Sequence, residues 1–222
     1  MLTRRDLICR GAALGAGALL ASPRGAGALE PEPTPATPAE ALARLAMGNQ
    51  RFIDGAVQGE RRDLARLREI APKQEPFAAF LGCADSRVPI ELAYDQGFGD
   101  LFVVRVAGNI ATAVEIASLE FGVAVLGCEA IVVLGHSNCG AVKAAMSRGD
   151  VPGQISTLYP HIVPALKPDM TLEEATAANV RYQMRKLRDA SPVLTRFIGE
   201  GKLALAGGVF DIATGRVAPV VL

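Results

Sequence analysis

The chain has 222 residues, half of them hydrophobic, and equal numbers of basic and acidic side chains, 23 of each. This length and apolar content suit one domain with a full buried core and argue against a disordered chain. The sequence shows no basic stripe with interleaved aromatic residues, so the composition argues against a nucleic-acid partner and favours a small substrate.

The N-terminal 28 residues resemble an export signal. Three arginines among the first ten residues precede twelve uncharged residues at 11–22, a run too short and too rich in Gly and Ala to span a bilayer. The stretch TRRDLI at 3–8 resembles a twin-arginine signal, and the small residues that end at Ala28 offer a cleavage site. We therefore expect an exported, periplasmic protein without a membrane anchor after cleavage; an ordinary amphipathic or disordered tail is the alternative.

Cleavage after Ala28 would remove four arginines, one aspartate and Cys9, leaving 19 basic and 22 acidic residues. The remaining cysteines are Cys83, Cys128 and Cys139. Paired cysteines usually form disulfides in an oxidising compartment, but three thiols do not pair off. Either one thiol is left over, or some of them do something other than cross-link the chain. The twin-arginine resemblance implies export of a folded protein, which would permit metal loading in the cytoplasm.

A proline-rich segment precedes the folded body. Residues 29–38, LEPEPTPATP, contain four prolines and predict an extended linker, so we expect a single domain over 39–222. From Pro38 the chain has apolar residues at helical spacing until Gly55, which predicts a first helix. A second short helix is expected over 61–70.

Four nearly continuous apolar runs predict strands that are buried on both faces, because they do not alternate with polar residues. Helical patterns separate them, and the last helix has a capping box at Thr171 and Glu174. This alternation predicts an α/β fold with a central, mostly parallel β-sheet flanked by helices. Residues 211–222 predict an antiparallel edge strand after a Thr-Gly turn. The strands are expected at 77–82, 101–106, 130–135 and 203–210, and the helices at 114–127, 140–149 and 171–190.

Unusual polar residues follow the first three predicted strands. The first strand runs into CADSR at 83–87, the second into AGN at 107–109, and the third into HSNCG at 136–140. Ligands of open parallel sheets bind outside the carboxyl ends of the strands, so these turns can converge on one crevice. No Gly-rich phosphate-binding fingerprint accompanies them, which weakens a nucleotide-binding interpretation.

Cys83, His136 and Cys139 form a candidate metal site of two thiolates and one imidazole. Each residue alone would more often be a small buried cysteine or a satisfied core histidine. Together at two strand ends they suit zinc, and three protein ligands leave the fourth tetrahedral position open for water, as in catalytic sites. Cys128 lies at the far end of the third strand, about 20 Å from His136 if that strand is extended, so it is not expected to be a ligand.

Asp85 and Arg87 lie beside this candidate site. Asp85 can either occupy the fourth metal position or orient a metal-bound hydroxide. An ion pair with Arg87 would hold the carboxylate away from the metal and keep it ionised. The pair is therefore expected to select the open form of the site.

Several motifs together resemble the β-class carbonic anhydrases. They are CADSRV, VVRVAGN, SLEFGVAVLG, VVLGHSNCGAV and GGVFDIATGRV, and the likeness runs from about residue 48 to the C-terminus. The resemblance implies the fold of that family and one Zn²⁺ per subunit on Cys83, His136 and Cys139, with Asp85 and Arg87 as the adjacent dyad. It also implies reversible hydration of CO₂ to bicarbonate and a proton by zinc-bound hydroxide, in a homodimer or homotetramer whose active-site cleft lies at the subunit boundary.

The same resemblance assigns residues to the substrate. Gln96 would donate to substrate from the neighbouring subunit, and the Gly140 amide would face bicarbonate. Phe102, Ala107 and Phe121 would line the CO₂ pocket.

The sequence also departs from the family pattern. Phe121-Gly122 stands where many relatives have Tyr-Ala, Phe210 replaces a usual Tyr, and no Trp is present, although the regulatory bicarbonate site of some members uses one. We therefore predict an open, water-ligated zinc at neutral pH. His161, the other histidine, is better interpreted as a surface or interface residue than as a proton carrier.

Three rival interpretations remain open. The first is a hydrolase of a CO₂-like molecule, carbonyl sulfide or carbon disulfide, on the same fold. The second is a non-catalytic exported zinc-binding protein, against which the intact Asp85–Arg87 dyad and Gln96 speak. The third is a hydrolase with Cys139 as nucleophile and His136 as base, which leaves Cys83 unexplained.

Overall fold

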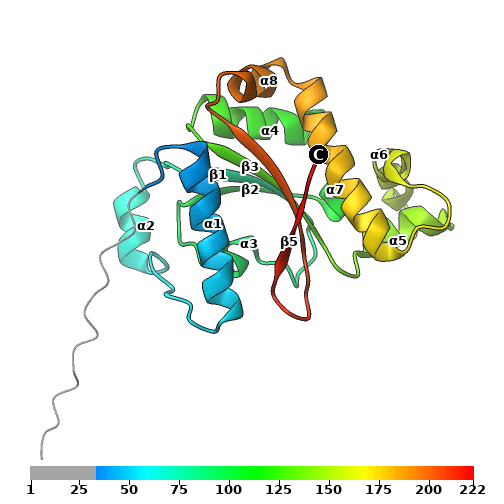
Figure 1. Cartoon of the computed structure of the whole chain (residues 1–222), viewed down its shortest axis with the longest axis horizontal. Coiled ribbons are helices and arrows are strands. Elements are labelled where there is room, and N and C mark those ends of the chain that lie inside the picture. Colours follow the sequence, from blue (N-terminus) through cyan, green and yellow to red (C-terminus); the bar gives the residue numbers. More distant parts are fainter. Residues whose placement is uncertain (1–33) are drawn as a thin grey trace, which may run out of the picture. The chain divides into compact units, whose positions relative to one another are not determined.

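The structure is a computed structural model that describes residues 34–222. The predicted export signal and the first part of the predicted linker lie outside the described residues. Strands and helices alternate along the chain as expected (Figure 1). The helices are α1 (Pro38–Ile53), α2 (Leu64–Ile70), α3 (Ile90–Ala93), α4 (Ala113–Ala124), α5 (Gly140–Ser147), α6 (Tyr159–Ile162), α7 (Leu172–Ala190) and α8 (Pro192–Gly199). The strands are β1 (Ala78–Gly82), β2 (Leu101–Arg105), β3 (Ala130–His136), β4 (Ala204–Phe210) and β5 (Val217–Val220), and short 3₁₀ turns occur at Ala107–Asn109, Ile155–Leu158 and Val163–Ala165.

One five-stranded sheet, in the order β2-β1-β3-β4-β5, forms the centre of the domain. The first four strands are parallel, and β5 pairs antiparallel with β4 at the edge. The predicted α/β class and the antiparallel edge strand are therefore confirmed. Because the parallel strands point the same way, the loops after β1, β2 and β3 emerge at the same edge of the sheet.

Helices cover both faces of the sheet (Figure 1). Alternate side chains of β1 go to opposite sides: Phe80 packs in the cluster that contains residues of α1 and α3, and Leu81 packs in the cluster that contains residues of α4, α7 and α8. Both faces of β1 and β3 are buried along their whole length. This double burial explains why these two strands have continuous apolar sequences.

The predicted helices form, with boundaries that differ by a few residues. α1 begins at Pro38, the last residue of the predicted linker, and the Thr37 side chain caps it by accepting from the Glu40 amide. The capping box of Thr171 and Glu174 is present at the start of α7. Helices α3, α6 and α8 were not predicted from the sequence. The first two have only four residues each, too few to show a hydrophobic period.

Helix α7 packs unusually close to the sheet. A Cβ atom on Gly135 of β3 would lie 2.7 Å from the Val180 side chain, and one on Gly207 of β4 would lie 2.4 Å from the Met184 sulfur. These glycines therefore leave the space that α7 occupies, so the helix sits against the backbone of β3 and β4.

Within residues 34–222, no helix combines the length and apolarity needed to cross a membrane.

Asp95 joins the segment after α1 to the loop that leads into β2. Its carboxylate is fully buried and accepts from Arg51 Nε at 2.7 Å and from the Arg62 guanidinium at 2.9 Å. The backbone amides of Gln58 and Gly59 also donate to it, at 3.0 and 3.2 Å. Burial alone would raise the pKa of Asp95, but the hydrogen bonds from Gln58, Arg51 and Gly59 lower it below its usual value.

We predict that Asp95→Ala lowers the free energy of unfolding by about 3 kcal/mol, because it removes the buried carboxylate that Arg51 and Arg62 share. The folded-state pKa of Asp95 lies below the unfolded value of about 3.9, so this stabilisation is complete above that pH and is lost on further acidification. Denaturant unfolding at several pH values measures the difference in the free energy of unfolding between the unmodified protein and Asp95→Ala.

Asp189→Ala is the matched control, since Asp189 pairs with Arg188 on the exposed surface. Its effect should stay within about 1 kcal/mol. A stability difference for Asp95→Ala that does not narrow below about pH 4 would contradict the assigned role of the carboxylate.

Candidate metal centre

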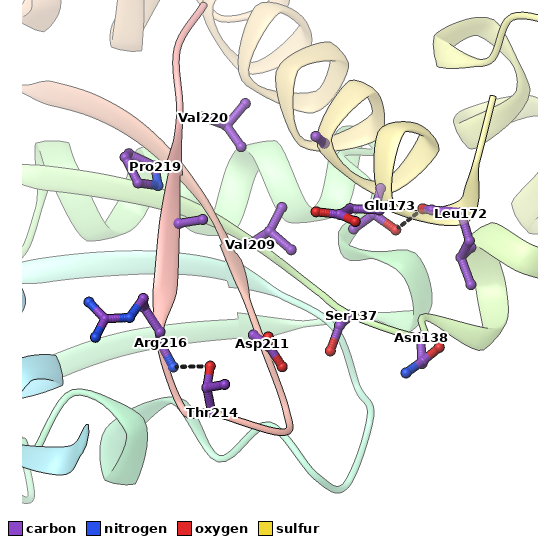
Figure 2. Close-up of a pocket in the computed structure, with 13 residues that line it drawn as sticks. Ser137, Asn138, Leu172, Glu173, Val209, Asp211, Thr214, Arg216, Pro219 and Val220 are labelled. Atoms are coloured by element: carbon purple, nitrogen blue, oxygen red, sulfur yellow. Dashed lines mark hydrogen bonds between the residues drawn. The ribbon is translucent and has the colours of Figure 1, made fainter. Parts of the chain in front are cut away.

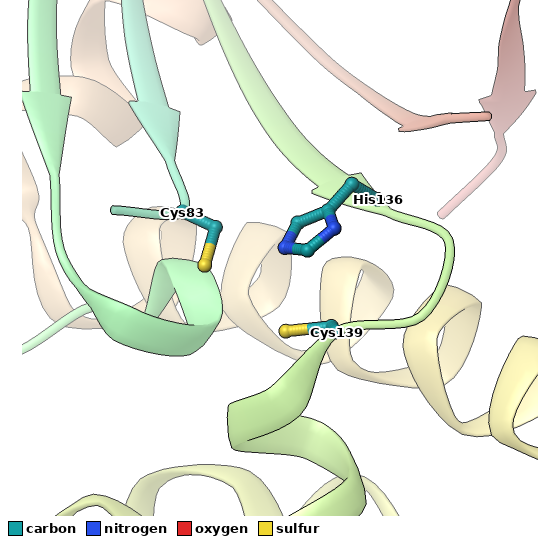
Figure 3. Close-up of side chains that lie close together, drawn as sticks. All are labelled: Cys83, His136 and Cys139. Carbon is teal, nitrogen blue, oxygen red and sulfur yellow. The ribbon is translucent and has the colours of Figure 1, made fainter. Parts of the chain in front are cut away.

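The three predicted ligands meet at the carboxyl edge of the sheet (Figure 3). Cys83 follows β1, His136 ends β3, and Cys139 is the residue before α5. Their ligand atoms all lie within 4.8 Å of one another, and all three residues are buried. The predicted convergence of these residues, which are up to 56 positions apart in sequence (83 to 139), is confirmed.

The His136 ring is oriented to serve as a ligand through Nε2. Its Nδ1 lies 2.9 Å from the Ser137 carbonyl oxygen, which can only accept, so Nδ1 carries the proton and Nε2 a lone pair. Nε2 is buried and has no hydrogen-bond partner among the described residues. An unpartnered buried nitrogen is costly, and a metal ion between this atom and the two sulfurs would satisfy it.

The two sulfur atoms differ in their affinity for a proton. A hydrogen bond from Cys139 lowers the pKa of Cys83 to about 4. The same contact with the Cys83 sulfur raises the pKa of Cys139. One thiolate is therefore already stabilised, and a divalent cation would replace the remaining proton with a charge that both sulfurs can share.

Two sulfurs and one imidazole are the donor set that zinc prefers, so the residues present fit the metal that the sequence predicts. In the part of the chain that the structure describes, this is the one group of three or more candidate ligands. Cys128 is separate from it: its buried thiol donates to the Pro76 carbonyl at 3.4 Å, and burial raises its pKa to about 12. The three cysteines of the described chain are free thiols.

Arg87 holds Asp85 beside the metal centre by three hydrogen bonds. Nε donates to Oδ1 at 2.9 Å, the terminal nitrogen donates to Oδ2 at 2.8 Å, and the Arg87 backbone amide donates to Oδ1 at 3.0 Å. The guanidinium lowers the pKa of Asp85 well below its usual range. Oδ2 lies 3.8 Å from His136 Nε2, so the ionised carboxylate borders the ligands while both of its oxygens are bound to Arg87.

Two further contacts to Cys83 were not predicted from the sequence. Arg105 donates to the carbonyl oxygens of Cys83 at 2.9 Å and Asp85 at 2.7 Å, and so supports the backbone of the loop after β1. The Gly108 amide donates to Cys83 Sγ at 3.3 Å. A charge at the end of an otherwise apolar strand was the available signal for Arg105. A backbone donor such as Gly108 leaves no side-chain signal.

The predicted substrate residues occupy two places. Ala107 begins the 3₁₀ turn after β2, next to Gly108, and Gly140 begins α5 with open space around its Cα. Phe102 and Phe121 instead pack against each other, with ring centroids 6.3 Å apart. Phe102 lies three residues before the end of β2, about 10 Å back from the edge that holds the ligands.

Gln96 lies apart from the metal centre of its own protomer. It precedes β2 and is therefore at the amino end of that strand. Its side chain is buried within the protomer, where Oε1 accepts from Arg44 Nε at 3.0 Å and Nε2 donates to the Tyr94 carbonyl at 2.7 Å. Gln96 also lines a surface pocket together with Leu92 and Phe98. Its donation to the substrate of the neighbouring subunit stays a prediction.

A cavity of about 460 Å³ lies beside the loop that carries two of the ligands (Figure 2). Ser137 and Asn138, which separate His136 from Cys139, line it together with residues of α7, β4 and β5. None of the three metal ligands lines this cavity. It is therefore distinct from the metal centre.

Comparisons with known proteins agree with this arrangement. The family model described as carbonic anhydrase matches residues 78–217. A carbonic anhydrase of Mycolicibacterium smegmatis is 35% identical over 189 residues, which cover 81% of this chain and 92% of that protein. The solved β-carbonic anhydrase of Coccomyxa, in complex with acetazolamide, is 26% identical with a TM-score of 0.64, covering 82% of this chain and 86% of that one. A tetrameric β-carbonic anhydrase of Sordaria macrospora is 25% identical with a TM-score of 0.63, covering 82% and 98%.

We predict that Cys83→Ala and Cys139→Ala each lose bound zinc, because two protein ligands hold zinc far more weakly than the three of a catalytic site. The zinc content of the purified protein, measured by elemental analysis, should fall from one ion per chain to less than about a tenth of that value. Cys128→Ala is the matched control, since it removes a buried thiol that is not a ligand. Zinc retained at full occupancy in Cys83→Ala would exclude this site.

Proposed function

The chain belongs to the β-class carbonic anhydrases, and from this premise we propose how its residues perform the reaction and where the protein acts. It is a zinc-dependent enzyme that interconverts carbon dioxide and bicarbonate with release or uptake of a proton. The observation that carries this conclusion is the buried cluster of Cys83, His136 and Cys139 with the Asp85–Arg87 pair beside it.

When held by these ligands, zinc supplies a Lewis acid that lowers the pKa of a coordinated water toward neutrality. The Ser137 carbonyl fixes the His136 ring so that Nε2 faces the metal position. Asp85, kept ionised by Arg87, accepts the O–H of the reacting water and orients its lone pair toward carbon dioxide. Because both oxygens of Asp85 are bound to Arg87, the carboxylate would be held away from the fourth position of a bound zinc.

The first turn of α5 provides a place for the product. Gly140 is exposed, and its amide belongs to the first turn of an eight-residue helix, whose amides have no partners within the helix. The helix dipole favours negative charge there, so the Gly140 amide can stabilise bicarbonate. Ala107, on the neighbouring turn, gives an apolar wall for carbon dioxide.

The rival interpretations are less well supported. The relatives are carbonic anhydrases, which does not favour a hydrolase of carbonyl sulfide or carbon disulfide. The intact ion pair of Asp85 and Arg87 is unnecessary in a protein that only binds zinc. A Cys139 nucleophile is disfavoured because its pKa is raised, whereas the thiolate is the nucleophilic form.

A homodimer formed through β2 is part of the proposal. β2 is an edge strand whose outer side pairs with no strand of the described chain, and it contains no proline. Leu92 and Phe98 expose 46% and 41% of their surface beside the start of β2. The other edge strand, β5, contains Pro219, which discourages further pairing. A second copy would cover the apolar edge, and pairing of two dimers would give a tetramer such as that of the Sordaria macrospora relative.

A dimer would also give the Phe102–Phe121 pair a role. Phe121 is exposed on α4, and the pair lies on the β2 side of the sheet rather than over the metal ligands of its own protomer. We assign this pair to the apolar wall of the cleft at the subunit boundary. The phenyl ring in place of a tyrosine removes a hydroxyl from that wall without changing the zinc ligands.

Export remains a proposal from the N-terminal sequence. The twin-arginine-like TRRDLI and the small residues before position 29 support secretion to the periplasm and cleavage after Ala28. Three free, buried thiols in the described chain are compatible with folding and metal loading before export. N-terminal sequencing of the exported protein tests the cleavage site, and a chain retained whole in the cytoplasm would exclude it.

We predict that the zinc-loaded protein hydrates carbon dioxide in a stopped-flow assay and that Arg87→Met lowers kcat by about 100-fold with zinc content unchanged. The reason is that Asp85, released from Arg87, can move into the fourth metal position. Crystal structures of both proteins at pH 7.5 should show Asp85 away from the zinc in the unmodified enzyme and bound to it in the variant.

Arg185→Met, which removes an exposed arginine from α7, should leave turnover unchanged. Full zinc occupancy without any hydration of carbon dioxide in the unmodified protein would contradict the proposed function. Asp85 bound to zinc in the unmodified enzyme at pH 7.5 would contradict the role given to Arg87.

We also predict that Phe98→Asp converts the oligomer to monomers, because it places a charge in the apolar surface beside the β2 edge. Light scattering after size-exclusion chromatography measures the mass. Val221→Asp, at the exposed residue that follows β5, is the control and should keep the dimer. If Val221→Asp dissociates the dimer and Phe98→Asp does not, the interface lies at the other edge of the sheet.

A further inference from the structure

Two buried amide side chains of α7 have no role in the proposed reaction. Asn179 and Gln183 are both 0% exposed, and they lie one helical turn apart on the same face of the helix. Burying an amide is unfavourable unless its donors and acceptors are paired, and an apolar residue would avoid this cost. Their partners therefore indicate what the two side chains do.

Both amides bind the backbone that follows β2. Asn179 Nδ2 donates to the Gly108 carbonyl at 2.9 Å, and Gln183 Oε1 accepts from the Ala111 amide at 2.9 Å. Gln183 Nε2 donates to Asn179 Oδ1 at 2.8 Å and to the His161 carbonyl at 2.7 Å. The two amides thus connect to each other and hold residues 108 and 111 against α7.

The residue that Asn179 holds is the one that contacts a zinc ligand. The Gly108 amide donates to Cys83 Sγ at 3.3 Å while the Gly108 carbonyl accepts from Asn179. Gly108 has φ +75°, a left-handed conformation that glycine adopts readily. A Cβ at Gly108 would lie 2.8 Å from the Ile162 side chain and 3.2 Å from Ala141, so the turn fits tightly between its neighbours.

A hydrogen bond to a thiolate withdraws electron density that the sulfur would otherwise donate to a metal. The amide of Gly108 can do this only while the turn keeps its position and orientation. α7 lies close enough to hold it because Gly135 and Gly207 leave room for the helix against the sheet.

We propose that Asn179 and Gln183 are positioning residues that set the Gly108 hydrogen bond to Cys83 and thereby the charge that Cys83 donates to the metal. They touch neither substrate nor ligand and act through the backbone of the turn at Ala107–Asn109. The inference rests on the metal centre of the proposed function, but its tests detect the metal and the hydrogen bond rather than turnover. If the protein did not hydrate carbon dioxide, the results of these tests could therefore still be interpreted.

The first test detects the hydrogen bond in the unmodified protein. With ¹¹³Cd in place of zinc, the metal should couple to the Gly108 amide proton through the Cys83 sulfur in NMR spectra. The Gly108 amide should also exchange slowly with solvent. Absence of the coupling together with rapid exchange would overturn the proposal without any need for a variant.

The second test weakens the positioning contacts. In cobalt(II)-substituted Asn179→Leu and Gln183→Met, loss of the hydrogen bond should shift the thiolate-to-cobalt charge-transfer band to longer wavelength, because the sulfur lone pair rises in energy. Zinc affinity, measured by competition with a chromophoric chelator, should fall by about 10-fold, because the turn no longer fixes the position of Cys83. The two variants are independent, so one remains informative if the other does not fold.

Thr176→Val is the matched control. Thr176 is buried on the same helix, and its hydroxyl donates to the Leu172 carbonyl within α7 rather than to the turn. This variant should lose some stability without any shift of the band. If the folded Asn179→Leu and Gln183→Met proteins keep the band of the unmodified protein, the two amides serve stability alone and the proposal is wrong.

Discussion

The rest of this structure depends on one requirement. Two cysteine sulfurs and one imidazole nitrogen must lie within 4.8 Å of one another in a buried place. Two adjacent thiolates repel each other, and without a metal they share a proton, which lowers the pKa of Cys83 to about 4 and raises that of Cys139. A divalent cation bound between the two sulfurs would offset this repulsion. The parallel sheet makes the meeting possible, because it brings the ends of β1 and β3 to one edge and holds them there by backbone hydrogen bonds.

Hydrogen bonds around the ligands determine how the site can be used. Arg87 occupies both oxygens of Asp85, Arg105 supports the carbonyls of Cys83 and Asp85, and the Ser137 carbonyl selects the tautomer of His136. Each of these contacts involves a charged group or a metal ligand, which makes it stronger than an ordinary surface hydrogen bond. Whether the predicted fourth metal position is open would therefore depend on the surrounding chain as much as on the three ligands.

The opposite end of the sheet contains buried ion pairs and hydrogen bonds instead of metal ligands. Asp95 with Arg51 and Arg62, and Gln96 with Arg44, tie the first helix and its following segment to the approach of β2. Such buried polar groups are tolerated only when they are paired, so these contacts stabilise this end of the sheet. The assignment of Gln96 to the substrate of the neighbouring subunit came from family resemblance and stays a prediction; within its own protomer Gln96 binds Arg44 and the Tyr94 carbonyl.

Local sequence determined the strands, the long helices, the capping box of α7 and the identity of the three ligands, because apolar period, turn chemistry and donor type depend on short segments. It also placed Cys83, Asp85 and Arg87 correctly at the end of β1. The contacts of Gly108, Asn179 and Gln183 could not be predicted, since a backbone donor has no side-chain signature and two amides on an apolar helix face reveal no partner. The burial of Gln96 was hidden for the same reason. Only the tertiary structure decided these points, because they depend on how closely α7 and α1 approach a sheet whose strands are joined across long stretches of chain.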